Sequence, residues 1–64
     1  SEFEVAFLPK TKLEVAVAEE KLEEVISTIK NSAKTGNFGD GKIFVTELDQ
    51  VIRIRTGEKG PEAI

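Results

Sequence analysis

The chain has 64 residues, of which 39% are hydrophobic and 33% are charged, and its net charge is −3. This length is enough for one domain at most, and a domain this small buries only about 60% of the surface that its unfolded chain exposes. The acidic balance argues against nucleic acid as a partner, because phosphate neutralisation needs a basic surface. Stability is therefore thin, and self-association is a reasonable expectation from the start.

Several other classes are disfavoured by residue types that are missing. Cysteine and histidine are absent, which removes disulfides, thiolate nucleophiles, imidazole bases and the usual zinc ligands. No apolar run approaches the about 20 residues that a membrane span needs, and no signal peptide is visible. We therefore expect a cytoplasmic protein that is not an enzyme, has no metal site and does not insert into a membrane.

The N-terminal part of the chain alternates with the period of a β-strand. Pro9 interrupts this pattern, because proline cannot donate a hydrogen bond to a ladder. We predict one strand that is bent near Pro9 and is clearest over residues 12–18. After Pro9, one face holds Leu13, Val15 and Val17, and before Pro9 the alternating apolar residues are Phe3, Val5 and Phe7.

A helix is predicted over residues 19–34. Its apolar positions form a one-sided stripe at helical spacing, with acidic residues in the first turn and lysines in the last. Gly36 follows as a stop in the left-handed conformation. The stripe consists of Leu22, Val25, Ile26, Ile29 and Ala33. The acidic residues lie around the outer side of the helix, where a solvated face is the expected role; they are Glu19, Glu20, Glu23 and Glu24.

Two further strands are predicted after a glycine-rich loop at residues 35–42. The first covers residues 43–48, and the second covers residues 51–55 after a turn at Asp49 and Gln50. A loop follows over residues 56–61. The predicted order is β-α-β-β, with Phe44 and the N-terminal phenylalanines in the core.

The glycine-rich loop allows two interpretations. Gly36, Gly41 and Lys42 have the spacing of a phosphate-binding P-loop, but Ile43 stands where Ser or Thr is required, and the loop follows a helix and opens a strand. The P-loop interpretation therefore fails. Successive backbone N–H groups can still form an anion nest, or the glycines can serve only a tight connection. Phe38 packs over the loop or covers the ring of a ligand.

The two arginines at Arg53 and Arg55 are the second candidate feature. On a strand, residues i and i+2 share a face, and two guanidinium groups side by side suit a phosphate chain. The alternative is an ordinary solvated face, or ion pairs with Glu47 and Asp49.

Four stretches together resemble one family. They read F-L-P-K at residues 7–10, L-E-V-A-V at residues 13–17, T-G-N-F-G-D-G-K-I-F-V at residues 35–45, and V-I-R-I-R-T-G-E at residues 51–58. Their order and spacing are similar to the second half of PII signal-transduction proteins. The resemblance implies that residues 1–64 are the C-terminal half of a PII-like domain. It also implies an α+β fold, half of a ferredoxin-like βαββαβ unit made of β-α-β and a short C-terminal strand.

The resemblance also implies a function. PII proteins are trimeric sensors of nitrogen status that bind ATP or ADP between subunits and, with Mg-ATP, 2-oxoglutarate. The matching nucleotide-binding positions here are Gly39, Asp40, Gly41, Lys42, Arg53, Arg55 and Glu14, and Lys10 matches a lysine that helps to hold 2-oxoglutarate. The front half is missing, so we expect weak or no nucleotide binding, a non-functional Lys10 and no binding of the usual protein partners. Phe3 lacks the hydroxyl of the tyrosine that many members carry there.

Two hypotheses remain at this point. The chain is a signal-transduction module with residual ATP or ADP phosphate-binding elements, or it is a truncated or engineered half-domain that self-assembles without a regulatory function. In either case a monomer has a one-strand gap in its sheet, between the strands at residues 12–18 and 43–48. A homodimer in which each strand 12–18 fills the gap of the other copy closes it, and higher homo-oligomers are a further expectation.

Overall fold

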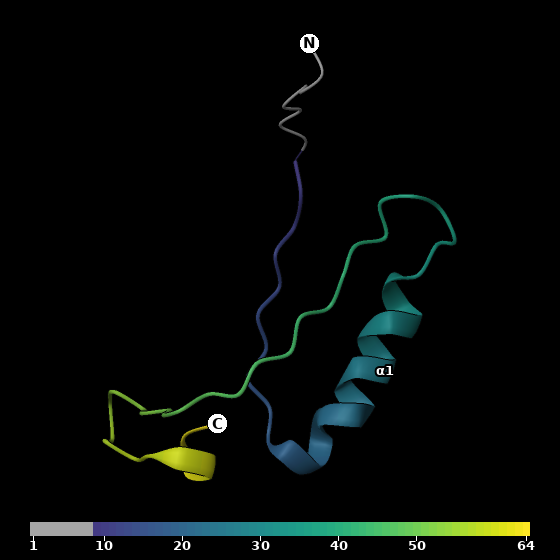
Figure 1. The fold of residues 1–64 in the computed structure, drawn as a ribbon. Helices are drawn as coiled ribbons and strands as arrows, with labels where there is room; N and C mark the ends of the chain where they lie inside the picture. The colour runs from purple at the N-terminus through teal and green to yellow at the C-terminus, as the bar shows by residue number, and fades with distance from the viewer. Residues whose placement is uncertain (1–8) are drawn as a thin grey trace.

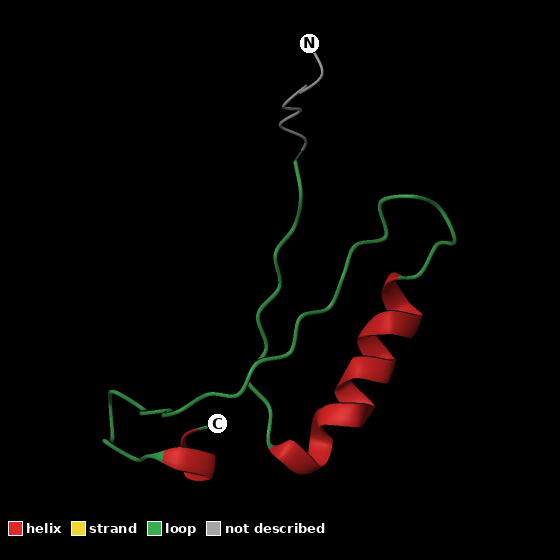
Figure 2. Ribbon diagram, viewed as in Figure 1, coloured by secondary structure: helices red, strands yellow, loops and turns green. Residues whose placement is uncertain are grey.

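The computed structural model describes residues 9–64 (Figures 1 and 2). A 3-10 turn, η1 (Glu19–Lys21), leads into the α-helix α1 (Leu22–Ala33), and a second 3-10 turn, η2 (Gly60–Ala63), lies near the C-terminus. The helix predicted over residues 19–34 is thus confirmed to within a residue, with its first turn wound more tightly. Within residues 9–64, no helix combines the length and the apolar composition needed to cross a membrane.

Local features of the sequence account for the bounds of α1. Glu23 and Glu24 stand in its first turn and Lys30 in its last, which suits the dipole at each end. The helix ends at Ala33, and Lys34 caps it with an extended backbone and an N–H that still donates to the Lys30 carbonyl. Gly36 then adopts a φ of 86°, which confirms the predicted left-handed stop.

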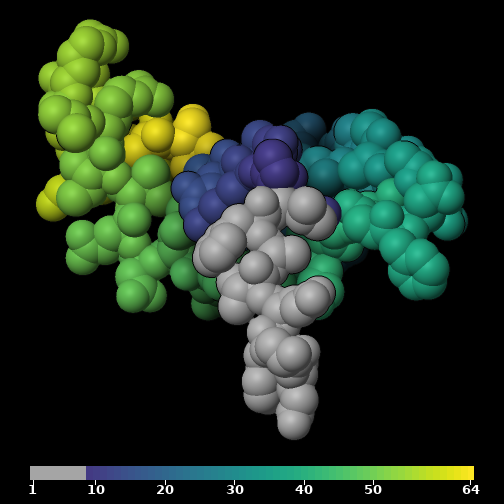
Figure 3. Space-filling view, turned by 90° about the horizontal axis from the view of Figure 1, so that it is seen from above, coloured from purple at the N-terminus to yellow at the C-terminus, as the bar shows by residue number. Residues whose placement is uncertain are grey.

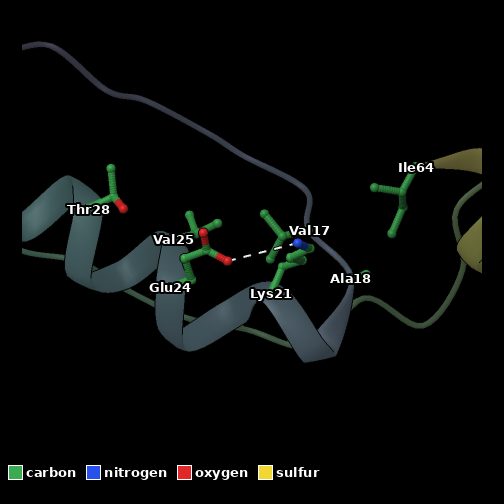
Figure 4. Close-up of a pocket in the computed structure, with 7 residues that line it drawn as sticks. All are labelled: Val17, Ala18, Lys21, Glu24, Val25, Thr28 and Ile64. Carbon is green, nitrogen blue, oxygen red and sulfur yellow. Dashed lines mark ion pairs between the residues drawn. The ribbon is translucent and has the colours of Figure 1, made fainter.

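The apolar stripe of α1 is only half-buried. Leu22, Val25, Ile26 and Ile29 are intermediate in exposure, whereas the polar positions of the helix are exposed. Val17 and Ile64 border a depression of about 460 Å³ over this face, together with Val25 (Figure 4). The stripe therefore has the beginnings of a core against the preceding segment, without the layer of sheet that would bury it.

The predicted strands at residues 12–18 and 43–48 do not form in the single chain. Both segments are drawn as loop and run in the same direction, antiparallel to α1 (Figure 2). None of the backbone hydrogen bonds of residues 9–64 joins the two segments. The strand prediction is thus wrong for the monomer. The physical reason is that a strand exists only through a ladder with a neighbour, and neither segment has one. The part of the predicted strand before Pro9 lies outside the described residues.

No residue between 9 and 64 is fully buried. Val15 is 52% exposed and Phe44 is 85% exposed, although the alternation of the sequence places both on apolar faces. The prediction that Phe44 belongs to a core is therefore wrong for the single chain. Phe3 and Phe7, predicted beside it, lie outside the described residues. In one copy of the chain, the described apolar side chains that the sequence pattern assigns to a core are not buried.

The C-terminal part forms a short hairpin in place of the strand predicted over residues 51–55. An isolated antiparallel bridge joins Ile52 to Lys59. The Arg53 N–H donates to the Glu58 carbonyl at 2.9 Å, and the Gly57 N–H donates to the Arg53 carbonyl at 2.7 Å. Residues 54–56 form the turn between them. The turn residues Thr56 and Gly57 favour this reversal over a continued strand.

Candidate functional site

The glycine-rich loop is held closed by the side chain of Asp40. Its Oδ2 accepts the N–H groups of Thr35 and Gly36, each at 3.0 Å. Its Oδ1 accepts the Thr35 hydroxyl. The Thr35 oxygen in turn accepts the Asn37 N–H at 3.2 Å. The loop is therefore closed on itself across five residues, although every residue in it is exposed.

Beyond this closure the loop offers donors to solvent. Gly39 and Gly41 have φ values of 99° and 94°, which only glycine adopts readily. Within the described chain, no hydrogen-bond acceptor is found for the backbone N–H groups of residues 38–42. Residues of positive and negative φ therefore alternate in this part of the loop, and its backbone N–H groups are available, as an anion-binding loop requires.

Two lysines add positive charge to the loop. Lys42 is the last residue of the loop and has no ion pair with any described acidic residue. Lys10 comes from the preceding extended segment, and its Nζ would lie 3.7 Å from a Cβ placed on Gly39. The sequence assigned Lys10 to 2-oxoglutarate and the loop to the nucleotide, and the structure places the Lys10 ammonium group beside Gly39. Gly36, Asn37, Phe38 and Asp40 line a depression of about 500 Å³ there.

Phe38 does not cover this depression. Its side chain is fully exposed, so the prediction that it packs over the loop is wrong for the single chain. The prediction that it covers the ring of a ligand stays a prediction.

Arg53 has partners that the sequence analysis missed. Its Nη1 lies 2.7 Å from Glu58 Oε1, and its Nη2 donates to the Glu62 carbonyl at 3.2 Å. The same Glu58 oxygen accepts the Thr56 hydroxyl at 2.8 Å. The alternative of pairing with Glu47 and Asp49 is wrong. The ion pair with Glu58 could have been predicted from the turn sequence T-G-E at residues 56–58, which folds the chain back on Arg53.

The two arginines do not share a strand face. Arg55 lies within the turn at residues 54–56, and it is exposed, whereas Arg53 is half-buried by its contacts. The prediction of a flat double fork on a strand is therefore wrong for the single chain. Both arginines still belong to the same hairpin, and the Arg53 guanidinium is paired with Glu58.

The glycine-rich loop and the arginine hairpin lie at opposite ends of α1 (Figure 1). The view from above agrees, with the teal loop region on one side and the lime-green hairpin on the other (Figure 3). Glu14 belongs to neither the loop nor the hairpin. Its side chain is exposed, and its Oε1 lies 3.2 Å from Lys12 Nζ. One chain therefore does not assemble the predicted nucleotide-binding residues around one ligand. Within residues 9–64, no three acidic side chains form a group that could hold a metal ion.

The closure of the loop should depend on pH through Asp40. The Thr35 hydroxyl, followed by the N–H groups of Thr35 and Gly36, lowers the pKa of Asp40. Because this pKa is lower in the closed loop than in the unfolded chain, the carboxylate stabilises the loop above the unfolded pKa. That stabilisation is lost as the pH falls through the lowered value. We expect the Gly36 amide resonance to move with a midpoint below the usual aspartate range, and a midpoint at or above that range would contradict the closure.

Comparison with known proteins shows the family of the chain. The sequence model of the family described as nitrogen regulatory protein P-II matches residues 1–58. The chain therefore belongs to the P-II family of nitrogen regulatory proteins. Family membership favours a ferredoxin-like fold, and residues 9–64 contain one α-helix and no strand.

Three relatives illustrate the match. Nitrogen regulatory protein P-II of Rhizobium meliloti (strain 1021) is 58% identical over 64 residues, which are 100% of this chain and 57% of the relative. Nitrogen regulatory protein GlnK of Escherichia coli (strain K12) is 55% identical over 64 residues, again 100% of this chain and 57% of the relative. Nitrogen regulatory protein P-II 2 of Methanothermobacter thermautotrophicus is 49% identical over 63 residues, 98% of this chain and 55% of the relative. The chain thus spans somewhat over half the length of these curated relatives.

Proposed function

We propose that this chain is a signal-transduction module of the P-II type. In this proposal, residues 1–64 are the C-terminal half of the domain and bind the phosphates of ATP or ADP. The proposal rests on the family match over residues 1–58. It also rests on a loop whose available N–H groups lie beside Lys10 and lead into Lys42. The proposed role is regulatory because the matching family and relatives are named nitrogen regulatory proteins.

The separation of the loop from the hairpin carries the proposal that the site lies between copies. Residues 39–42 and the two arginines are at opposite ends of α1 in one chain (Figure 1). A nucleotide that contacts both groups must therefore receive them from two chains. In this arrangement, the loop of one copy and Arg55 of a neighbour bind the same phosphate chain, and the exposed Arg55 is available for that contact.

The unpaired segments favour completion of the fold by self-association. Residues 12–18 and 43–48 run parallel with no bond between them, and Val15, Phe44 and Val45 are all more than half exposed. Open edges of this kind pair readily with another chain. A two-fold dimer in which each copy's residues 12–18 fill the gap of the other forms a sheet over the stripe of α1. Such a closed contact is the commonest kind of oligomer.

Calorimetric titration with ADP, with adenosine as the control ligand, tests the phosphate-binding role. We expect ADP to bind no more tightly than about mid-micromolar, near −6 kcal/mol, because the loop and the arginine hairpin lie apart in one chain and their exposed groups exclude water poorly. Adenosine should bind at least tenfold more weakly, since it lacks the phosphates to which the N–H and ammonium groups of the site would donate hydrogen bonds. Equal binding of both ligands would contradict a phosphate site, and no heat for ADP at millimolar concentration would contradict nucleotide binding.

A further inference from the structure

We propose that Asp40 is a positioning residue of the loop and not a ligand of the nucleotide. Its side chain closes residues 35–40 into a ring and thereby presents the N–H groups of residues 38–42 on the outer side of that ring. This inference rests on the proposed phosphate-binding function. It replaces the expectation that Asp40 contacts the phosphates in the same way as its glycine neighbours.

The orientation of the carboxylate is the first argument. Both of its oxygens are engaged, Oδ2 by two backbone N–H groups and Oδ1 by the Thr35 hydroxyl. All three donors belong to Thr35 and Gly36, at the start of the loop. An ionised carboxylate only accepts hydrogen bonds, so it offers nothing to a phosphate directly. The carboxylate points toward these donors, which partly compensate its negative charge, so the charge stabilises the loop itself.

The flexibility of the loop supplies the second argument. Three glycines, Gly36, Gly39 and Gly41, occur within six residues, and glycine loses more conformational freedom on ordering than any other residue. An open loop of this composition would have to be ordered when the anion binds, which weakens binding. A side chain that closes the loop beforehand removes part of this cost. Here the Asp40 side chain closes the loop through three hydrogen bonds to Thr35 and Gly36.

Thr35 extends the effect of Asp40 toward the tip of the loop. Its hydroxyl donates to Asp40 Oδ1 and accepts the N–H of Asn37 at 3.2 Å. The residues that follow Asn37 carry the available N–H groups. The hydrogen bonds therefore run from Asp40 through Thr35 to the residue just before the proposed nest.

The test compares two substitutions that remove the same charge, Asp40→Ala and Asp40→Asn, by titration with ADP. Alanine removes all three hydrogen bonds, whereas asparagine keeps an acceptor for the N–H groups and can donate to the Thr35 oxygen. We expect Asp40→Ala to weaken ADP binding about tenfold, in line with the value of a hydrogen bond to a charged group. Asp40→Asn should stay within about threefold of the original chain. Thr35→Val should weaken binding, with Thr35→Ser as its matched control.

Amide hydrogen exchange without nucleotide provides an independent measurement. The Thr35 and Gly36 amides should lose protection in Asp40→Ala and keep most of it in Asp40→Asn. Equal ADP affinity in the original chain and Asp40→Ala would overturn the inference. A loss of affinity in Asp40→Asn as large as in Asp40→Ala, with the Thr35 and Gly36 amides still protected in Asp40→Asn, would also overturn it, because the loop would then be closed and the lost charge itself would be what matters. If the original chain does not bind ADP, the proposed function fails, and the exchange data alone then decide whether Asp40 holds the loop.

Discussion

Val15→Glu is expected to abolish self-association of the chain. In the single chain Val15 is 52% exposed, so a glutamate there costs the monomer little. In the proposed dimer the same position lies under α1, in the core shared by two copies. An unpaired charge buried in such a core costs several kcal/mol, and about 3–5 kcal/mol corresponds to a loss of association of some 100- to 5,000-fold. Sedimentation equilibrium over a range of concentrations measures this directly.

The matched control is Thr11→Glu, which introduces the same charge at an exposed position just before the segment at residues 12–18. It should leave the association constant within a fewfold of the original chain. Two outcomes would refute the dimer. One is the mass of a single chain for the original protein, with cooperative unfolding independent of concentration. The other is undiminished association of Val15→Glu.

Lys42→Ala should produce the largest loss of ADP affinity among single substitutions in the loop. Lys42 has no ion pair with a described acidic residue, and it directly follows the available N–H groups of the loop. A charge-assisted hydrogen bond to phosphate contributes about 1.5–3 kcal/mol, which predicts a loss of about 10- to 150-fold. Titration with ADP at constant ionic strength measures it.

Lys34→Ala separates a direct contact from a general effect of charge. Lys34 carries the same charge and stands at the start of the same loop, where α1 ends. If Lys42 contacts the phosphate, Lys34→Ala should weaken binding by less than threefold, because exposed charges at a distance are screened by salt. Similar losses in both variants would show that only the general positive field matters, and unchanged affinity in Lys42→Ala would contradict the assigned role.

The features that could be predicted from sequence are those decided by neighbouring residues. The helix over residues 19–33 follows from the spacing of its apolar residues and from the charges in its terminal turns. The positive φ of Gly36 follows from its place after the helix. Each depends on contacts within a few residues, which a pattern in one sequence records.

The features that could not be predicted depend on partners elsewhere. The alternation at residues 12–18 indicates a strand, but an alternating segment forms a ladder only if another strand lies beside it. Arg53 was predicted to share a face with Arg55, whereas Glu58 and the Glu62 carbonyl hold it across a turn. Asp40 was predicted as a nucleotide contact by resemblance alone, and its hydrogen bonds to Thr35 and Gly36 became visible only in the structure.

The half-buried face of α1 has a consequence for how the protein reaches its native state. A helix of 12 residues is at the lower limit of what persists in water without tertiary packing. If a second copy supplies that packing, helix formation and association become a single bimolecular reaction. The refolding rate then rises with protein concentration, and newly made chains remain open to proteases until they meet a copy. The amount of assembled protein would therefore respond steeply to the level at which the chain is synthesised.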